Sequence, residues 1–96
     1  MESLEQLRKS IDNIDNAIIA MFAERFKVTD RVGIYKAANN LAPKDIARET
    51  QQFSRIDDLA KQYGLDGQIA QSYLTAMIER VIERHEASAN ALVKGD

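Results

Sequence analysis

One long segment sets the architecture of this chain: residues 4–38 read LEQLRKSIDNIDNAIIAMFAERFKVTDRVGIYKAA. Apolar residues recur along it at alternating steps of three and four, which is the heptad spacing of a seam on one face of an α-helix. The seam comprises Leu4, Leu7, Ile11, Ile14, Ile18 and Met21, and it resumes at Val28, Val32 and Tyr35. Because no proline interrupts the segment, we predict one helix over residues 4–38, about 50 Å long at ~1.5 Å per residue.

Two shorter helices are predicted to follow it. Residues 39–44 form a loop around the single proline, and Asp45 can cap the next helix. Gly64 is a typical stop for that helix, and Asp66 can cap a third helix over about residues 67–90. The predicted buried sides are Ile46, Phe53, Ile56 and Leu59 in the second helix, and Ile69, Tyr73, Leu74, Met77, Ile78, Val81 and Ile82 in the third.

Composition narrows the class of protein. The 96 residues are 45% apolar and 29% charged, so we expect one all-α globular domain over residues 1–96. A net charge of −2 leaves no basic excess for binding nucleic acid. With no cysteine and one histidine, the sequence excludes disulfides, a thiol nucleophile and a Cys or His-cluster metal site. A polar N-terminus and the lack of a run of ~20 apolar residues predict a cytoplasmic protein that binds no membrane.

The length of the first helix bears on oligomeric state. Two shorter helices cannot cover a rod of about 50 Å in a chain of 96 residues, so much of the apolar seam would face water. Small domains also bury a low fraction of their surface, which makes association favourable. We infer that a second chain covers the seam.

Three cationic residues of the first predicted helix are candidates for binding a small anion. Arg25 occupies a seam position, where a buried guanidinium is costly unless it is paired. It either reaches the edge of the seam, pairs with a carboxylate across a dimer, or binds a ligand. Lys36 lies three turns further on nearly the same face, so the two side chains could bridge a small anion across ~16 Å. Arg8 lies about 25 Å from Arg25 along the axis and could reach that anion only from a partner chain. Taken alone, Arg8 and Lys36 are ordinary surface charges.

The later helices hold two further candidates. Asp45, Arg48 and Glu49 share one face at the start of the second helix, although a cap followed by surface charges is the ordinary interpretation. His85 extends the apolar stripe of the third helix, where a core or edge histidine is commoner than a catalytic one. The sequence has no glycine-rich phosphate loop, Ser–His–Asp order or paired acid–base carboxylates.

Taken together, these segments resemble a known family. LRKSIDNIDNAIIAMFAERF, then VGIYKAANN, then P-x-D-x-x-R-E at residues 43–49, are similar in order and interval to the all-helical chorismate mutases. The resemblance covers about residues 4–86. It implies an intertwined homodimer of three-helix subunits, with two sites that each draw on both chains. It further implies the rearrangement of chorismate to prephenate, a step towards phenylalanine and tyrosine, without metal or cofactor.

The resemblance also implies roles for individual residues. Arg8 of the partner subunit and Arg25 would clamp two substrate carboxylates, while Lys36 and His85 would donate to the ether oxygen. Asp45 and Glu49 would orient the ring hydroxyl or fix Arg48. The remaining implied contacts are Val32, Ile78 and Ile82 as an apolar wall, and Val81, which stands where the best-known pattern has a serine that touches a carboxylate. His85 stands where that pattern has glutamine or glutamate.

Three other functions remain open from the sequence. An isochorismate pyruvate-lyase of the same fold needs the same cationic site, although the D-x-x-R-E helix start favours a mutase, and a mutase acting on an amino analogue of chorismate is a smaller possibility. A non-catalytic helical dimerisation or regulatory module would explain the seam equally well. Arg25 within the seam argues against such a module, because a structural zipper gains little from a buried cation.

Overall fold

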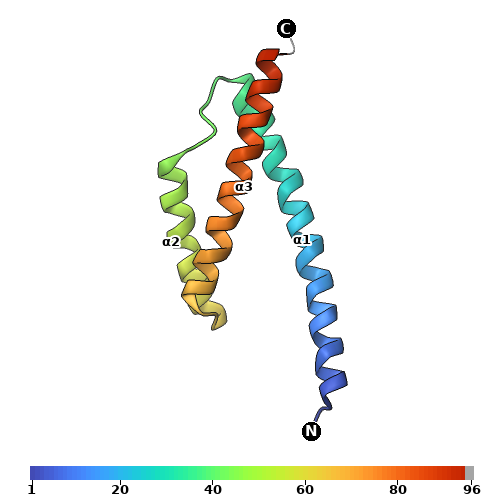
Figure 1. The fold of residues 1–96 in the computed structure, drawn as a ribbon. Coiled ribbons are helices and arrows are strands. Elements are labelled where there is room, and N and C mark those ends of the chain that lie inside the picture. Colours follow the sequence, from blue (N-terminus) through green and yellow to red (C-terminus); the bar gives the residue numbers. More distant parts are fainter. Residues whose placement is uncertain (95–96) are drawn as a thin grey trace.

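The computed structural model describes residues 1–94, with side chains placed through residue 91. Its three helices are α1 (Leu4–Ala38), α2 (Ile46–Tyr63) and α3 (Gly67–Lys94), and the described residues contain no strand (Figure 1). The predicted all-α fold is confirmed, and so are the bounds of the first helix. The third helix continues past residue 90, where we expected it to end.

The helix boundaries follow from local chemistry. Asp45 Oδ1 accepts a hydrogen bond of 3.0 Å from the backbone N–H of Arg48, which starts α2. Gly64 adopts φ +68°, the left-handed conformation that terminates α2 at little cost for a residue without Cβ. Asp66 Oδ1 accepts 2.8 Å from the N–H of Gln68 in the first turn of α3. All three predicted boundary residues therefore act as expected.

The three helices form an open arrangement in which α3 is central. Helix α3 packs against α1 near their C-terminal ends and against α2 along its other half, while the N-terminal half of α1 projects away from both (Figure 1). The chain measures 63 × 26 × 14 Å and has a radius of gyration of 17.3 Å. A compact domain of this length would have a radius of about 12.5 Å. A single chain is therefore far from compact.

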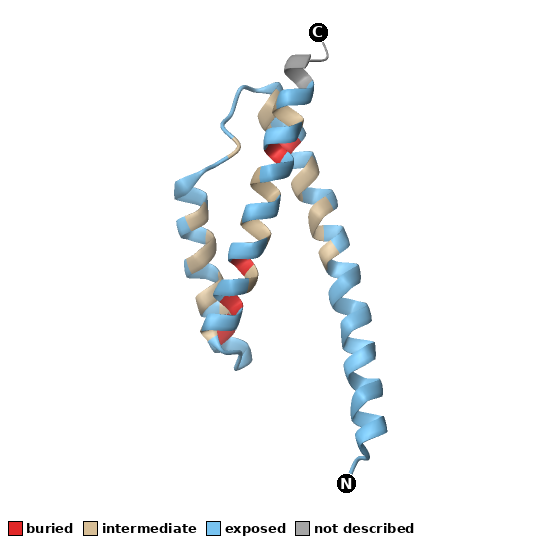
Figure 2. Cartoon of the chain, viewed as in Figure 1, coloured by how far each residue is buried: buried red, intermediate tan, exposed pale blue. Residues whose placement is uncertain are grey.

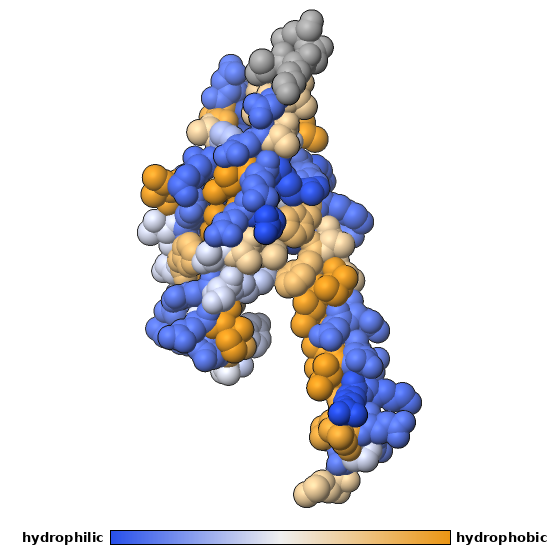
Figure 3. All heavy atoms as spheres, in the orientation of Figure 1, coloured by the Kyte–Doolittle hydropathy of each residue, from blue (hydrophilic) through white to orange (hydrophobic). Residues whose placement is uncertain are grey.

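Little of the chain is buried. The buried apolar residues are Ala60, Ala70 and Leu74, where α2 meets α3, and His85 is buried where α3 meets α1 (Figure 2). Every residue from 1 to 21 is exposed. The apolar side chains of α1 form a row on its free half, which faces the gap between the helices in Figure 3. The seam thus lies in water in the single chain, as its length led us to expect.

Two residues of the predicted buried sides are instead exposed. Ile46 is 70% exposed because it opens α2 at the end that lies away from α3 (Figure 1). Ile69 is 58% exposed because it lines an open apolar groove at the opposite end of α2, together with Leu59, Tyr63 and Leu65. Within the part of the chain that the structure describes, no helix is both long and apolar enough to cross a membrane.

Candidate active site

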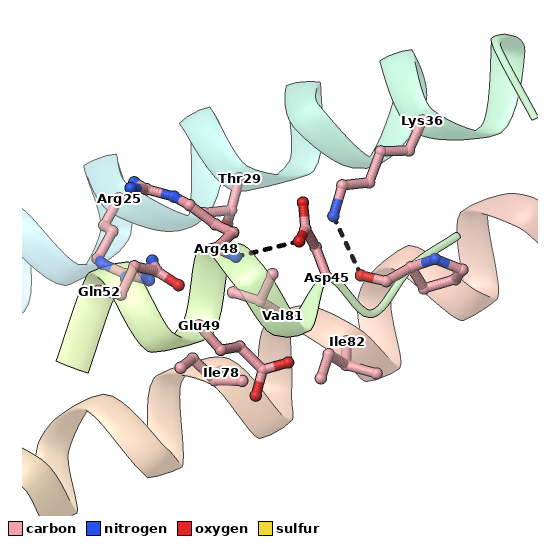
Figure 4. A pocket seen from close by; sticks show the side chains of 11 residues that line it. Arg25, Thr29, Lys36, Asp45, Arg48, Glu49, Gln52, Ile78, Val81 and Ile82 are labelled. Carbon is pink, nitrogen blue, oxygen red and sulfur yellow. Dashed lines mark hydrogen bonds between the residues drawn. The ribbon is translucent and has the colours of Figure 1, made fainter. Parts of the chain in front are cut away.

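One pocket gathers most of the predicted site residues. It lies between the C-terminal half of α1, the start of α2 and the middle of α3 (Figure 4). The side chains that line it are Arg25, Thr29, Lys36, Pro43, Asp45, Arg48, Glu49, Gln52, Ile78, Val81 and Ile82.

Helix α1 supplies two cations to this pocket. Arg25 is half-buried, and its Nη1 atom is buried without a hydrogen-bond partner in the described chain. Lys36 Nζ donates a hydrogen bond of 3.1 Å to the backbone oxygen of Pro43, in the loop that joins α1 to α2. A buried guanidinium nitrogen without an acceptor is rare and costly, because donors in protein interiors are normally satisfied. Arg25 is therefore held in a position that fold stability alone does not favour.

Helix α2 supplies one cation and two carboxylates. Asp45 caps the helix, and Arg48 Nη1 donates 2.8 Å to Gln51 Oε1. Lys44 Nζ lies 3.2 Å from Oε2 of Glu49 and donates to its Oε1 at 3.3 Å. Oε2 is buried and has no hydrogen-bond partner in the described chain, although Lys44 Nζ lies within ion-pair distance of it. Glu49 therefore keeps an accepting oxygen at the pocket.

The charge balance of the pocket is positive although the chain is negative overall. Three cations, Arg25, Lys36 and Arg48, face two carboxylates, Asp45 and Glu49. None of the three cations forms a salt bridge among the described residues. A partly desolvated wall raises the effective strength of these charges, so the charge of the pocket is complementary to that of a small anion.

Helix α3 supplies that wall. Ile78, Val81 and Ile82 are half-buried and line the side of the pocket opposite α1 (Figure 4). Their spacing of three and one places all of them on one face of the helix. They give the pocket a dry apolar side, which suits the carbon skeleton of a ligand whose charges face the cations.

The structure does not bring three predicted site residues to this pocket. Arg8 is exposed on the free half of α1, as the distance along the helix requires. Val32 is 42% exposed and lies outside the lining, because it belongs to the uncovered seam of α1. His85 is 3% exposed and also lies outside the lining.

His85 lies beside the pocket and contacts the first helix. Its Nε2 atom lies 2.8 Å from the backbone oxygen of Thr29, so in this structure the ring bridges α3 to α1. The ring can approach α1 this closely because Gly33 has no side chain there. The geometry is that of a core histidine on an apolar stripe, with one ring nitrogen hydrogen-bonded and Nδ1 buried without a partner in the described chain.

An ion pair lies beside this histidine. Arg84 Nε donates 2.7 Å to Asp30 Oδ1, a second bond joins Arg84 Nη2 to Asp30 Oδ2, and the guanidinium stands 5.6 Å from the centre of the Phe26 ring. The hydrogen bond from Arg84 is the main cause that lowers the pKa of Asp30 below its ordinary value. The same hydrogen bond raises the pKa of Arg84. The pair ties α3 to α1 next to the pocket.

Two polar residues of the lining were not anticipated from sequence. Thr29 lies one turn after Arg25 on α1, and its hydroxyl donates 3.2 Å to the backbone oxygen of Phe26. Gln52 lies one turn after Arg48 on α2, beside Arg25. Helical spacing from the two arginines could have found both. Among the described residues, no group of three His, Cys, Asp or Glu side chains is arranged to hold a metal ion.

The fold and the pocket together define a class: an all-helical domain with a cationic pocket that has an apolar wall. A family model for chorismate mutase type II matches residues 7–86, and the chain belongs to this family. The chorismate mutase of Methanocaldococcus jannaschii is 33% identical over 79 residues, which are 82% of this chain and 80% of that protein.

Longer relatives carry a second activity in their names. The bifunctional chorismate mutase/prephenate dehydratase of Buchnera aphidicola subsp. Acyrthosiphon pisum is 33% identical over 92 residues, covering 96% of this chain and 23% of that protein. The protein of the same name from Aquifex aeolicus is 42% identical over 65 residues, covering 67% of this chain and 18% of that protein. The chain thus spans less than a quarter of the length of these two relatives.

Proposed function

We propose that this chain is a chorismate mutase that converts chorismate to prephenate in phenylalanine and tyrosine biosynthesis. The observation that carries the proposal is the set of three cations without salt-bridge partners, Arg25, Lys36 and Arg48, facing an apolar wall in a chain of this family. Chorismate carries two carboxylates on a small carbon skeleton, which matches a pocket with this division of charge.

The reaction is a [3,3]-sigmatropic rearrangement, in which one C–O bond breaks and one C–C bond forms within the same molecule. It needs no nucleophile and no electron donor, so the pocket has to hold the reacting ends together. Arg25 would bind a carboxylate, since the guanidinium fork matches the two carboxylate oxygens. Holding the substrate in its compact reactive conformation supplies the orientational part of catalysis.

Lys36 would supply the electrostatic part. The ether oxygen gains negative charge as the C–O bond breaks, and a positioned ammonium stabilises that charge more in the transition state than in the ground state. In the free chain Lys36 donates to the backbone oxygen of Pro43, so this ammonium is already oriented towards the pocket. On binding it would exchange that carbonyl for the ether oxygen.

The carboxylates would orient the rest of the substrate. Glu49 Oε2 is buried and accepts no hydrogen bond, so it can accept one from the ring hydroxyl. Asp45 uses Oδ1 to cap α2 and thereby fixes the backbone of Arg48. Ile78, Val81 and Ile82 would contact the carbon skeleton.

The proposed enzyme is a homodimer whose sites are shared between chains. The chain exposes 7616 Å², whereas a compact monomer of 10.8 kDa would expose about 5,500 Å². The excess of about 2,000 Å² per chain corresponds to a dimer interface of about 4,000 Å² in total, in the range of obligate dimers. The exposed apolar seam of α1 supports the same assembly, because it needs a cover. In such a dimer, Arg8 of the partner subunit would complete the pocket.

A direct assay tests this proposal. Purified protein is incubated separately with chorismate and with isochorismate, and the products are identified by mass and by chromatography against standards. We expect loss of chorismate with formation of prephenate. Release of pyruvate from isochorismate, without prephenate from chorismate, would identify a lyase instead. Neither reaction would favour the non-catalytic module.

A further inference from the structure

The environment of the single histidine sets the protonation pattern of its ring. His85 is 3% exposed, and its Nε2 atom lies 2.8 Å from the backbone oxygen of Thr29. A carbonyl oxygen only accepts hydrogen bonds, so Nε2 carries the proton. Nδ1 is buried and has no partner in the described chain. In the neutral ring Nδ1 bears no proton, so the ring has no second donor to offer.

The contact between His85 and Thr29 also depends on a glycine of α1. A Cβ atom added to Gly33 would lie 2.6 Å from Cδ2 and 3.2 Å from Nε2 of His85, closer than side chains tolerate. Gly33 is also the buried residue of α1. The absence of a side chain at this position is therefore what lets the ring reach the carbonyl of Thr29.

The residues next to His85 and Thr29 form a second contact between α3 and α1. Arg84, next to His85 on α3, donates to Asp30, next to Thr29 on α1. Consecutive residues of one helix thus hold consecutive residues of the other. The side chain of Thr29 lines the pocket, and Val81 of the apolar wall lies one turn before His85 on α3.

We propose that His85 is a positioning residue, whose Nε2–H bond to the Thr29 carbonyl, seated on Gly33, fixes α3 against α1 beside the pocket. The proposal rests on the mutase function and assigns donation to the ether oxygen to Lys36 without help from His85. The distance between the α1 cations and the α3 wall then depends on this contact. Displacing reacting groups by about 1 Å can lower a rate by about 10²-fold.

The first test reads the ring directly. Because the chain has one histidine, nitrogen-15 NMR of His85 is free of overlap. At mildly alkaline pH we expect a protonated Nε2 and a bare Nδ1 in the free protein. We expect the same pattern with saturating prephenate and an unshifted Nε2–H signal, because the bond to Thr29 persists. A proton on Nδ1, loss of the Nε2 proton, or a shift of the Nε2–H signal on binding would overturn the proposal. The measurement on the free protein needs no activity, so it stands even if the mutase function fails.

The second test perturbs the ring without touching the pocket. We expect Gly33→Ala to lower kcat about 10²-fold at a temperature where circular dichroism shows full helicity, and we expect the same of His85→Ala. The double variant should be no worse than His85→Ala, because removing the ring makes room for the new methyl group. The matched control is Gly67→Ala, whose added Cβ makes only an ordinary contact of 3.6 Å. It should keep full activity.

Two outcomes would contradict the positioning role. A merely structural contact predicts that Gly33→Ala lowers Tm while kcat of the folded protein stays unchanged. A role as donor to the substrate predicts that the Nε2–H signal of His85 shifts when prephenate binds, because the proton would leave the Thr29 carbonyl for the ligand. If Gly33→Ala does not fold, the NMR pattern of the natural chain still decides between the two roles of His85.

Discussion

Replacing Arg25 by methionine should move activity and stability in opposite directions. Arg25 is half-buried, lines the pocket and has a buried Nη1 atom without an acceptor in the described chain. Methionine has a similar length and no charge. Arg25→Met therefore removes the proposed carboxylate ligand and, at the same time, an uncompensated cation from a partly dry site.

The magnitudes follow from that geometry. Removing one partner of a buried, hydrogen-bonded ion pair costs about 3–5 kcal/mol, so kcat/KM should fall roughly 10²- to 10⁴-fold. Removing a half-buried unpaired charge should raise the free energy of unfolding by about 1 kcal/mol, which is roughly 4–8 °C in Tm for a domain of this size. A continuous assay of chorismate loss gives the first quantity, and thermal unfolding followed by circular dichroism gives the second.

Arg31→Met is the matched control, because it makes the same change of charge at an exposed position of α1 outside the pocket. Its activity should stay within about twofold of the natural chain and its stability within about 0.5 kcal/mol. The reasoning is refuted if Arg25→Met keeps near-full activity. It is refuted equally if Arg25→Met and the control lose activity alike.

Three further variants test separate parts of the account. Lys36→Met should lower kcat by roughly 10²-fold or more while KM changes less, because the ammonium acts mainly on charge that develops in the transition state; equal loss through KM alone would contradict this. Gln52→Glu should raise KM about tenfold or more by placing a carboxylate beside Arg25, whereas Gln62→Glu, exposed at the end of α2, should leave KM unchanged. The third variant tests stability in acid. The folded-state pKa of Asp30 is lowered, so its ion pair with Arg84 stabilises the folded state at pH values above the unfolded-state pKa of about 3.9. This stabilisation is lost as the pH falls through the lower folded-state pKa. Asp30→Asn should therefore lower Tm only slightly at neutral pH, because the pair is exposed, and should reduce the loss of Tm in acid; an unchanged acid profile would contradict it.

The helices could be predicted because their signals are local. The heptad spacing from Leu4 onward and the lack of a breaker gave the bounds of α1, and Asp45 and Gly64 marked the ends of α2 through side-chain and backbone chemistry. Pocket residues on one helix face, such as Arg25 and Lys36, were likewise predictable from spacing alone. In each case the relevant partners lie within a few turns of the same chain segment.

The contacts between helices were harder to predict. Spacing places His85 on the inner stripe of α3 but does not show what it meets there, and its partners Thr29 and Gly33 lie more than fifty residues earlier. Val32 shows the same difficulty. Its position in the apolar seam of α1 was clear from the sequence. Whether its side chain also lines the pocket depends on the angle at which the helices cross, which the spacing does not give.

The central claim is that each pocket needs Arg25 of one chain and Arg8 of the other, and subunit mixing tests it most directly. Arg8→Ala and Arg25→Met are each purified as inactive proteins, unfolded, mixed in equal amounts and refolded together. Random pairing makes half of the dimers hybrids, each with one intact site, so the mixture should regain about one quarter of the activity of the natural chain. Activity no higher than the mean of the two parent proteins would contradict a site built from both chains.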